Sequence, residues 1–411
     1  MGLLCEKQEP HALILNIFPL ILLIYLGGYP NRICLKYVKN SCKGGRFMRK
    51  TYLDNIRWMT VVLVVIYHVV FMFNGVSTAG VIGPFRDFQP QDTYQYIVYP
   101  WFMLLLFTVS GMAARFELNG KSGKQFIKDR TRKLLVPSTI GLLIWGWILG
   151  YYNMAIAGAI DQMTAVPKPI LYIIMCISGI GPLWYIQELW IFSIFLVVIR
   201  KLEKDKLYRL GGRTNIVVLC LLAVVIYGAA QILNMPVVIC YRFGIYGAGF
   251  LIGYFILSHD EVMDRIGKYW ILFTVLGVIS GVVFVVMYSG QPYPEHSVLD
   301  TWMCNLYAWF GTLGVLAFMK KWGNFENRFS KWMSKKSWGL YIFHYMFIAA
   351  AAWYLTPLLG DTSPLLVYIL VAIAGFGGSY ILYELVSRIP VIRWCVLGIR
   401  KKKKIEGANE V

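Results

Sequence analysis

The stretch YLDNIRWMTVVLVVIYHVVFMFNG, residues 52–75, decides the fold, because it is an apolar run of the length that crosses a membrane as one helix. Arg57 stands near its start and His68 lies inside it. Eleven residues of α-helix make about three whole turns and rise about 16 Å, so the two side chains share one face. That face holds a fixed positive charge at one end and a titratable imidazole in the middle.

The composition of the whole chain indicates the same class of protein. Of its 411 residues, 58% are hydrophobic and only 15% are charged, whereas soluble globular chains have about 25% charged residues. The net charge of +19 comes from Lys and Arg in short segments between long apolar runs. We therefore predict an all-α, polytopic membrane protein in a lipid bilayer, with no nucleic-acid partner.

The eight cysteines show no CxxC or CxxH spacing, and most of them lie within apolar runs. Such a distribution favours neither a disulfide framework nor a zinc site. We expect no bound metal and no bound cofactor.

Ten membrane spans are predicted from the apolar runs. They are residues 56–75, 97–114, 134–152, 182–199, 214–233, 236–257, 269–288, 299–319, 337–356 and 364–387. The segments between them alternate in basic content: residues 115–133 hold seven Lys and Arg, whereas residues 77–96 hold only Arg86. By the positive-inside rule the basic segments and the C-terminus are cytoplasmic.

The domain organisation follows from these spans. Residues 1–47 form an N-terminal extension with one marginal hydrophobic segment, residues 11–28, which is an extra span, a signal-like anchor, or sequence upstream of a true start at Met48. Residues 48–395 form the membrane domain, and residues 396–411 form a basic cytoplasmic tail.

Two further segments have an expected position in the membrane. Residues 169–180 are too short to span, so we predict a re-entrant or surface-lying segment on the outer side. Tyr94, Tyr96, Tyr99 and Trp101 are typical of an interfacial aromatic belt.

Ionisable residues inside predicted spans are costly and therefore indicate function; they are His68, Glu188, Arg242, His344 and Glu384. His68 is the strongest candidate for a catalytic residue, because a neutral imidazole can act as a base. The alternative is that His68 is a buried histidine that forms a hydrogen bond to a neighbouring helix. Glu384 is predicted to pair with Arg388 four residues on. Near the helix start, Thr51 and Asp54 fit a capping box.

Glu188 and Arg242 each lie six residues into a span entered from the outer face. Their similar depth is compatible with a buried, structural ion pair. Alternatively, they line an outward cavity for the hydroxyls of an acceptor, in which Trp184 stacks on a sugar.

The chain resembles a known family at several points. Arg57, ten residues and then His68 match the Arg-x10-His signature in the first helix of the membrane acyltransferase-3 family. Residues 126–137 (FIKDRTRKLLVP) are similar to its basic RxxR stretch. Residues 181–185 (GPLWY) and 337–344 (SWGLYIFH) resemble later landmarks and add Tyr341 and His344 to the site. Lys133 replaces the usual second Arg, which puts bidentate phosphate recognition in doubt unless Arg132 substitutes.

The resemblance implies an integral-membrane O-acyltransferase that modifies bacterial cell-envelope material, similar to glucan succinyl-transfer and polysaccharide acetyl-transfer members. Acyl-CoA would be the co-substrate, with its phosphates near Arg57, Arg130, Arg132 and Lys133. His68 would act at the transfer point, and Trp184, Glu188, Arg242, Tyr341 and His344 would serve the acceptor or support the site. The acceptor would be a glycan or glycolipid.

Two other classes stay open on the residues alone. In a transporter or flippase of a glycan or lipid-linked substrate, the buried charges would form a substrate or proton path. A structural or sensory membrane protein is the third reading.

Overall fold

The computed structural model describes residues 50–76, 80–87, 89–236 and 238–400. The chain divides into two units, Met1–Met48 and Arg49–Val411, and only the second contains described residues. The predicted extension at residues 1–47, its hydrophobic segment and the last residues of the basic tail lie outside the described part.

The described residues form helices joined by short loops, without a β-strand and with one isolated antiparallel bridge between Asn234 and Arg242. An all-helical bundle is expected in lipid, because helices satisfy their backbone hydrogen bonds internally. The α-helices are α2 (Thr51–Phe71), α3 (Thr93–Leu118), α4 (Gly123–Arg130), α5 (Trp147–Ile156), α6 (Lys168–Ser178), α7 (Trp184–Glu203), α8 (Lys206–Gly211), α9 (Ile216–Ala230), α10 (Phe243–Ile252), α11 (Asp260–Lys268), α12 (Trp270–Tyr288), α13 (His296–Leu299), α14 (Trp302–Trp322), α15 (Arg328–Leu359), α16 (Pro364–Ile373), α17 (Ser379–Arg388) and α18 (Pro390–Leu397).

Several helices continue through wider or tighter turns. The π-helical segments are η2 (Thr131–Leu135), η3 (Pro137–Gly146), η6 (Gly253–Leu257) and η7 (Ala374–Gly378). The 3₁₀ turns are η1 (Pro90–Asp92), η4 (Asp161–Met163) and η5 (Gly181–Leu183). Pro137 lacks an N–H and cannot complete a regular turn, which accounts for the widened helix around it.

Within the described residues, eight helices are long and apolar enough to cross a membrane. The chain is therefore a multi-pass membrane protein. Two predicted spans, residues 214–233 and 236–257, form the shorter apolar helices Ile216–Ala230 and Phe243–Leu257. The segment between these two helices is not helical, and Leu233 within it has a left-handed backbone conformation with φ of 57°. The total of ten spans stays a prediction.

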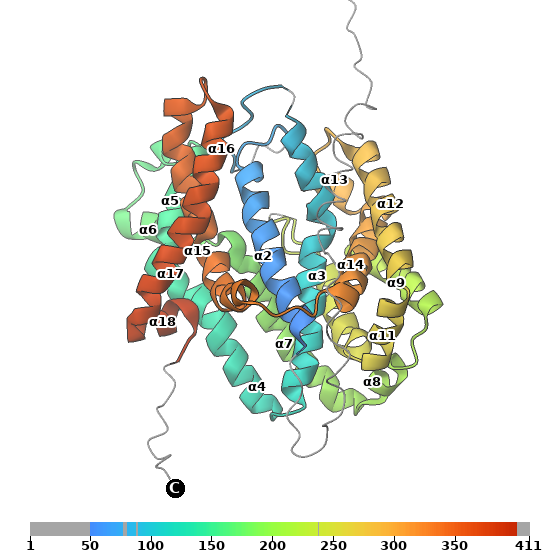
Figure 1. Cartoon of the computed structure of the whole chain (residues 1–411). Helices are drawn as coiled ribbons and strands as arrows, with labels where there is room; N and C mark the ends of the chain where they lie inside the picture. Colours follow the sequence, from blue (N-terminus) through green and yellow to red (C-terminus); the bar gives the residue numbers. More distant parts are fainter. Residues whose placement is uncertain (1–49, 77–79, 88, 237, 401–411) are drawn as a thin grey trace, which may run out of the picture. The chain divides into compact units, whose positions relative to one another are not determined.

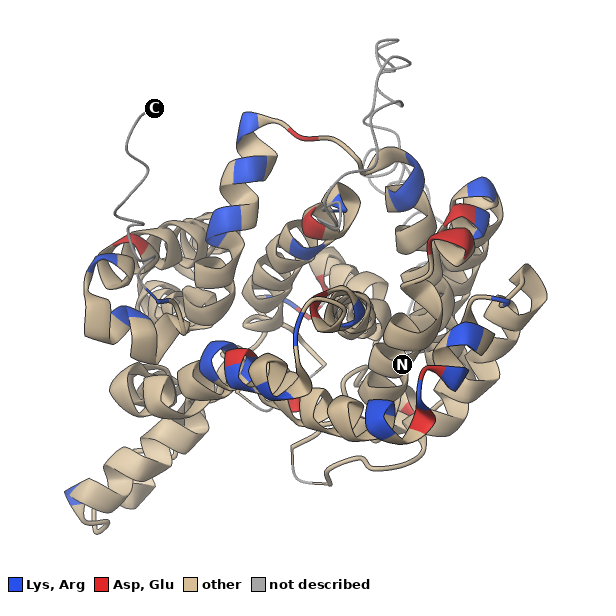
Figure 2. Cartoon of the chain, turned by 90° about the horizontal axis from the view of Figure 1, so that it is seen from below, with Lys and Arg blue, Asp and Glu red and all other residues tan. Residues whose placement is uncertain are grey.

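The basic residues are concentrated at one end of the bundle. Figure 2 shows the bundle from the end at which α4, α8 and α11 lie, and the Lys and Arg residues, drawn in blue, lie at the helix ends on this side. This one-sided distribution matches the alternation in the sequence, and its assignment to the cytoplasm stays a prediction.

The short helix α6 runs back along α5; that it is a re-entrant or surface-lying segment stays a prediction. A Cβ atom at Gly150 of α5 would lie 1.7 Å from the carbonyl oxygen of Met175, and one at Gly179 would lie 1.9 Å from that of Gly146. The order of these contacts makes the two helices antiparallel. Only glycine permits backbones to approach so closely.

The helix α2 lies between α15 and α3 (Figure 1). It begins at Thr51 with Lys50 as N-cap, and no side chain caps it. The predicted capping box of Thr51 and Asp54 is therefore wrong. Asp54 instead accepts a hydrogen bond from Nη1 of Arg57 at 2.9 Å, because residues three apart meet on a helix surface.

The predicted aromatic belt is also wrong, since its residues pack inside the bundle. Tyr96 and Trp101 are buried, and Tyr94 donates to the carbonyl oxygen of Leu63 at 3.1 Å. The hydroxyl of Tyr96 donates to the carbonyl oxygen of Gln291 at 2.6 Å. The polar tips of Tyr94 and Tyr96 thus find protein partners, so these rings belong to the core.

Close contact between α3 and α10 provides a test of the packing. A Cβ atom at Gly111 would lie 1.9 Å from the carbonyl oxygen of Phe250, so Gly111→Val must push the helices apart and destabilise the fold by about 1–3 kcal/mol. We expect a lower melting temperature of the detergent-solubilised protein. Gly120→Val is the control, because a Cβ atom there meets nothing within 4 Å. Equal melting temperatures of the Gly111→Val and Gly120→Val proteins would contradict this packing.

Candidate active site

The helices α2 and α15 bring His68 and His344 together in the interior. His68 is the eighteenth residue of α2, and His344 lies in the middle of the long helix α15. Their rings are 4.9 Å apart between centroids. His344 is fully buried and His68 is partly exposed. The two histidines that the sequence placed 276 positions apart thus form one pair.

The backbone around His344 determines which of its nitrogens carries a proton. Its Nδ1 lies 2.9 Å from the carbonyl oxygen of Leu340 and 2.9 Å from that of Tyr341. Carbonyl oxygens only accept hydrogen bonds, so Nδ1 is the donor. In the neutral ring, Nε2 of His344 therefore bears a lone pair.

The same reasoning settles the neutral form of His68. Its Nδ1 lies 2.9 Å from the carbonyl oxygen of Val64 and 3.0 Å from Nε2 of His344. Both neighbours accept, so Nδ1 of His68 carries the proton and shares it between them. Its Nε2 is left with a lone pair and has no hydrogen-bond partner among the described residues. His68 is thus arranged as a base.

Aromatic side chains surround this pair. The ring of Tyr345 lies 4.7 Å from that of His68, and the ring of Tyr67 lies 5.1 Å away. The hydroxyl groups of Tyr67 and Tyr293 are 3.0 Å apart. These contacts restrict the orientation of the imidazole, which general-base chemistry requires. Neither Tyr67 nor Tyr293 carried a signal in the sequence, since aromatic residues are abundant throughout it.

The basic residues predicted to hold the donor lie at the start of the third long helix. Arg130 ends α4, and Arg132 and Lys133 lie on η2. Arg130 forms an ion pair with Glu117 at 3.1 Å, and Arg132 one with Asp129 at 3.5 Å. The Nε–H groups of both arginines have no acceptor in the described part of the chain. Lys133 is exposed.

Arg57 faces this cluster. It lies close enough to Arg130 for the two positive charges to repel each other, and Tyr185 lies within electrostatic reach of both. The side chain of Arg57 is 37% exposed. The neighbouring carboxylates offset this positive charge only in part. The cluster is therefore suited to bind an anionic group such as phosphate.

Two tyrosines lead from the basic cluster toward the histidines. The ring of Tyr185 lies 5.7 Å from that of Tyr341, which in turn lies 6.3 Å from His344. The hydroxyl groups of Tyr185 and Ser110 are 2.9 Å apart. Tyr341 donates to the carbonyl oxygen of Pro182. The landmark segments 181–185 and 337–344 are therefore in direct contact, beside the histidine pair.

The predicted ion pair between Glu188 and Arg242 is not formed. Arg242 donates to a carboxylate oxygen of Asp300 at 3.1 Å and to the carbonyl oxygen of Leu299 at 3.2 Å. Asp300 also contacts Nδ1 of His296 at 2.9 Å. The segments before α10 and α14 meet here, which spacing along the chain does not reveal. Asp300, the second residue of a predicted span, was the charge that the sequence reasoning missed.

The predicted pair of Glu384 and Arg388 is wrong as well. Glu384 of α17 forms its ion pair with Lys336 of α15, and Arg388 is exposed. The neighbouring helix supplies a closer cation than the next turn does. Glu384 therefore joins two helices and takes no part in the site.

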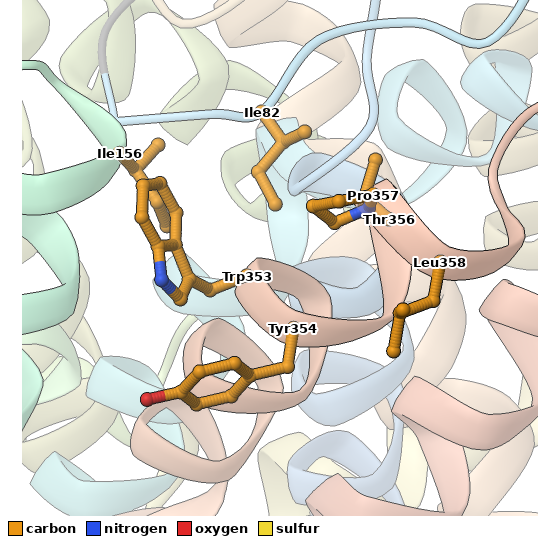
Figure 3. A pocket seen from close by; sticks show the side chains of 7 residues that line it. All are labelled: Ile82, Ile156, Trp353, Tyr354, Thr356, Pro357 and Leu358. Carbon is orange, nitrogen blue, oxygen red and sulfur yellow. The ribbon is translucent and has the colours of Figure 1, made fainter.

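One cavity lies away from these charged groups. It has a volume of about 460 Å³ and is lined by the ends of α5 and α15 and by Ile82 of the loop after α2 (Figure 3). Its side chains are mainly apolar and include Trp353, Tyr354 and Leu358. No cluster of three potential metal ligands occurs among the described residues.

Fold and site together define a multi-pass membrane protein whose helix α2 carries Arg57 of the basic cluster at one end and His68 of the histidine pair further along. Residues 50–384 match the family model described as an acyltransferase domain, so the chain belongs to the membrane acyltransferase-3 family. It is an integral-membrane acyltransferase that transfers groups other than aminoacyl groups. Comparisons with curated proteins and with solved structures gave no match.

Proposed function

We propose that this enzyme moves an acyl group, such as acetyl or succinyl, from acyl-CoA to a hydroxyl of a cell-envelope glycan or glycolipid. The observation that carries the proposal is the contact between Nδ1 of His68 and Nε2 of His344. It leaves Nε2 of His68 as the free base for a hydroxyl. The enzyme would act in the cytoplasmic membrane of a bacterium, with the donor entering from the cytoplasm.

The proposed reaction is a single transfer that balances without a cofactor. Nε2 of His68 takes the proton of the acceptor hydroxyl while its oxygen attacks the thioester carbonyl carbon. The new C–O bond forms and the C–S bond breaks. The leaving thiolate takes the proton from His68 and departs as the free thiol of CoA. His344 holds the imidazole in place throughout.

The donor would bind across the basic cluster. Arg57, Arg130, Arg132 and Lys133 offer positive charge to the phosphates of CoA, and the path along Tyr185 and Tyr341 leads the thioester inward. Lysine is a point charge without the planar fork of arginine, so Arg130 and Arg132 would make the directional contacts.

Replacing Arg130 tests donor binding. We expect Arg130→Ala to raise KM for acyl-CoA about tenfold or more, because a hydrogen bond to a charged group contributes roughly 1.5–3 kcal/mol; kcat should change little. Lys128→Ala is the control, since Lys128 is an exposed cation on the same helix. If both variants keep the KM of the unmodified enzyme, Arg130 is only a topological anchor.

A reconstituted assay tests the reaction. Purified protein in vesicles receives radiolabelled acetyl-CoA or succinyl-CoA and an envelope extract, and the label is followed into glycan or glycolipid. We expect label that mild base releases, as an oxygen ester does. Uptake of extract components into the vesicles without covalent labelling would instead indicate a transporter.

A further inference from the structure

Glu188 of α7 is a buried carboxylate that lacks partners. It has no exposed surface, and neither carboxylate oxygen has a hydrogen-bond partner of normal geometry in the described part of the chain. The backbone of Arg242 approaches it without completing such a bond. Buried polar groups in native proteins are almost always satisfied, so the missing donors point to a ligand.

Aromatic rings stand around this carboxylate. Trp184 lies one turn before Glu188, and its ring is 6.2 Å from that of Tyr241 and 5.5 Å from that of Tyr246. The hydroxyl of Tyr241 donates to the side-chain oxygen of Gln187, the residue before Glu188. Trp184 and Tyr241 are partly exposed, so a ligand can contact the accessible part of each ring. A few polar groups among aromatic rings are typical of a small-molecule site.

The charges nearby restrict the ligand. Arg242 uses its guanidinium on Asp300 and on the carbonyl oxygen of Leu299, so it does not satisfy Glu188. Its positive charge still lies close to Glu188 and disfavours a cation there. Burial favours the neutral form of a carboxyl group, which accepts hydrogen bonds and also donates one. The group that fits is therefore neutral and both donates and accepts, and neighbouring hydroxyls of one molecule would reach both oxygens.

We propose that Glu188 and Trp184 form the acceptor subsite and bind a neutral sugar ring. The carboxyl group forms hydrogen bonds with two neighbouring hydroxyls, and the indole contacts the apolar face of the ring. Ring contacts connect this subsite to the histidine pair: the ring of Tyr185 lies 6.4 Å from that of Trp184 and 5.7 Å from that of Tyr341, whose ring lies 6.3 Å from that of His344. Naming this sugar as the acceptor rests on the proposed function; the binding of a sugar does not.

Kinetics test the role of Glu188 in the reaction. With the envelope extract as acceptor, we expect Glu188→Gln to raise KM for the acceptor by about tenfold to a hundredfold, because an NH₂ group replaces one carboxyl oxygen and removes a hydrogen bond at a buried group. KM for acyl-CoA should stay unchanged. Glu203→Gln, at the other end of α7, is the control. An unchanged KM for the acceptor in Glu188→Gln, with transfer intact, would overturn the subsite and leave the proposed function standing.

Binding is measured separately through Cys240, which lies within electrostatic reach of Glu188. Full-length protein is treated with N-ethylmaleimide, and modification of Cys240 and of the distant Cys395 is quantified by peptide mass spectrometry. Glucose, galactose or N-acetylglucosamine should slow modification of Cys240 severalfold, leave Cys395 unaffected, and have no effect in Glu188→Gln.

Two results would contradict the sugar site. One is equal modification of Cys240 with and without every sugar tested. The other is protection by choline alone, which would assign the aromatic rings to a cation. Protection by sugar in a protein that transfers no acyl group would refute the proposed function and keep the sugar site. Trp184→Phe, which retains an aromatic ring, should weaken protection even if Glu188→Gln fails to fold.

Discussion

Replacing His68 with alanine is expected to lower kcat for acyl transfer by roughly 10²–10⁴-fold, the usual contribution of a general base. The physical reason is that Nε2 of His68 is the lone pair left free when Nδ1 is shared between Val64 and His344. The measurement is the rate of label transfer from acyl-CoA by purified protein.

The control for this variant is His259→Ala. His259 stacks on Tyr208 at 3.9 Å between ring centroids and contacts neither member of the histidine pair. It should keep its activity, and both variants should be present at the level of the unmodified protein. Retained transfer by His68→Ala would refute the mechanism.

Replacing His344 should produce the second-largest loss. His344→Phe keeps an aromatic ring but offers no acceptor to Nδ1 of His68, so the imidazole loses its fixed orientation and tautomer. We expect kcat to fall by about tenfold to a hundredfold, the equivalent of one lost hydrogen bond at a buried group. KM for acyl-CoA should not change, because the basic cluster lies elsewhere.

A conservative replacement separates positioning from mere packing. The amide oxygen of His344→Gln can accept the hydrogen bond that Nε2 accepts in the native enzyme. This variant should recover part of the activity that His344→Phe loses. If glutamine and phenylalanine are equally inactive, or if phenylalanine is harmless, His344 does not position His68.

Local pattern alone predicted a large part of this architecture. The membrane helices follow from apolar runs, and the shared helix of Arg57 and His68 follows from their spacing. The short segment that became α6 was identified by its length. These features depend on neighbours in sequence, which is why they could be read without a structure.

Contacts between distant helices could not be read in the same way. The partner of Arg242 is Asp300 and that of Glu384 is Lys336, although nearer charges in the sequence suggested others. Side-chain periodicity shows which face a residue occupies and does not reveal which helix covers that face. The pairing of His68 with His344 is of this kind, since each stood out as an ionisable residue in a span but their contact required the fold.

The most direct test of the account compares envelope glycans by mass spectrometry from cells with this protein, cells without it, and cells that carry His68→Ala. We predict glycan or glycolipid species whose added mass equals an acyl group in the first sample, and their absence from the other two. Identical glycan masses in all three samples, with the protein present in the membrane, would contradict the central claim.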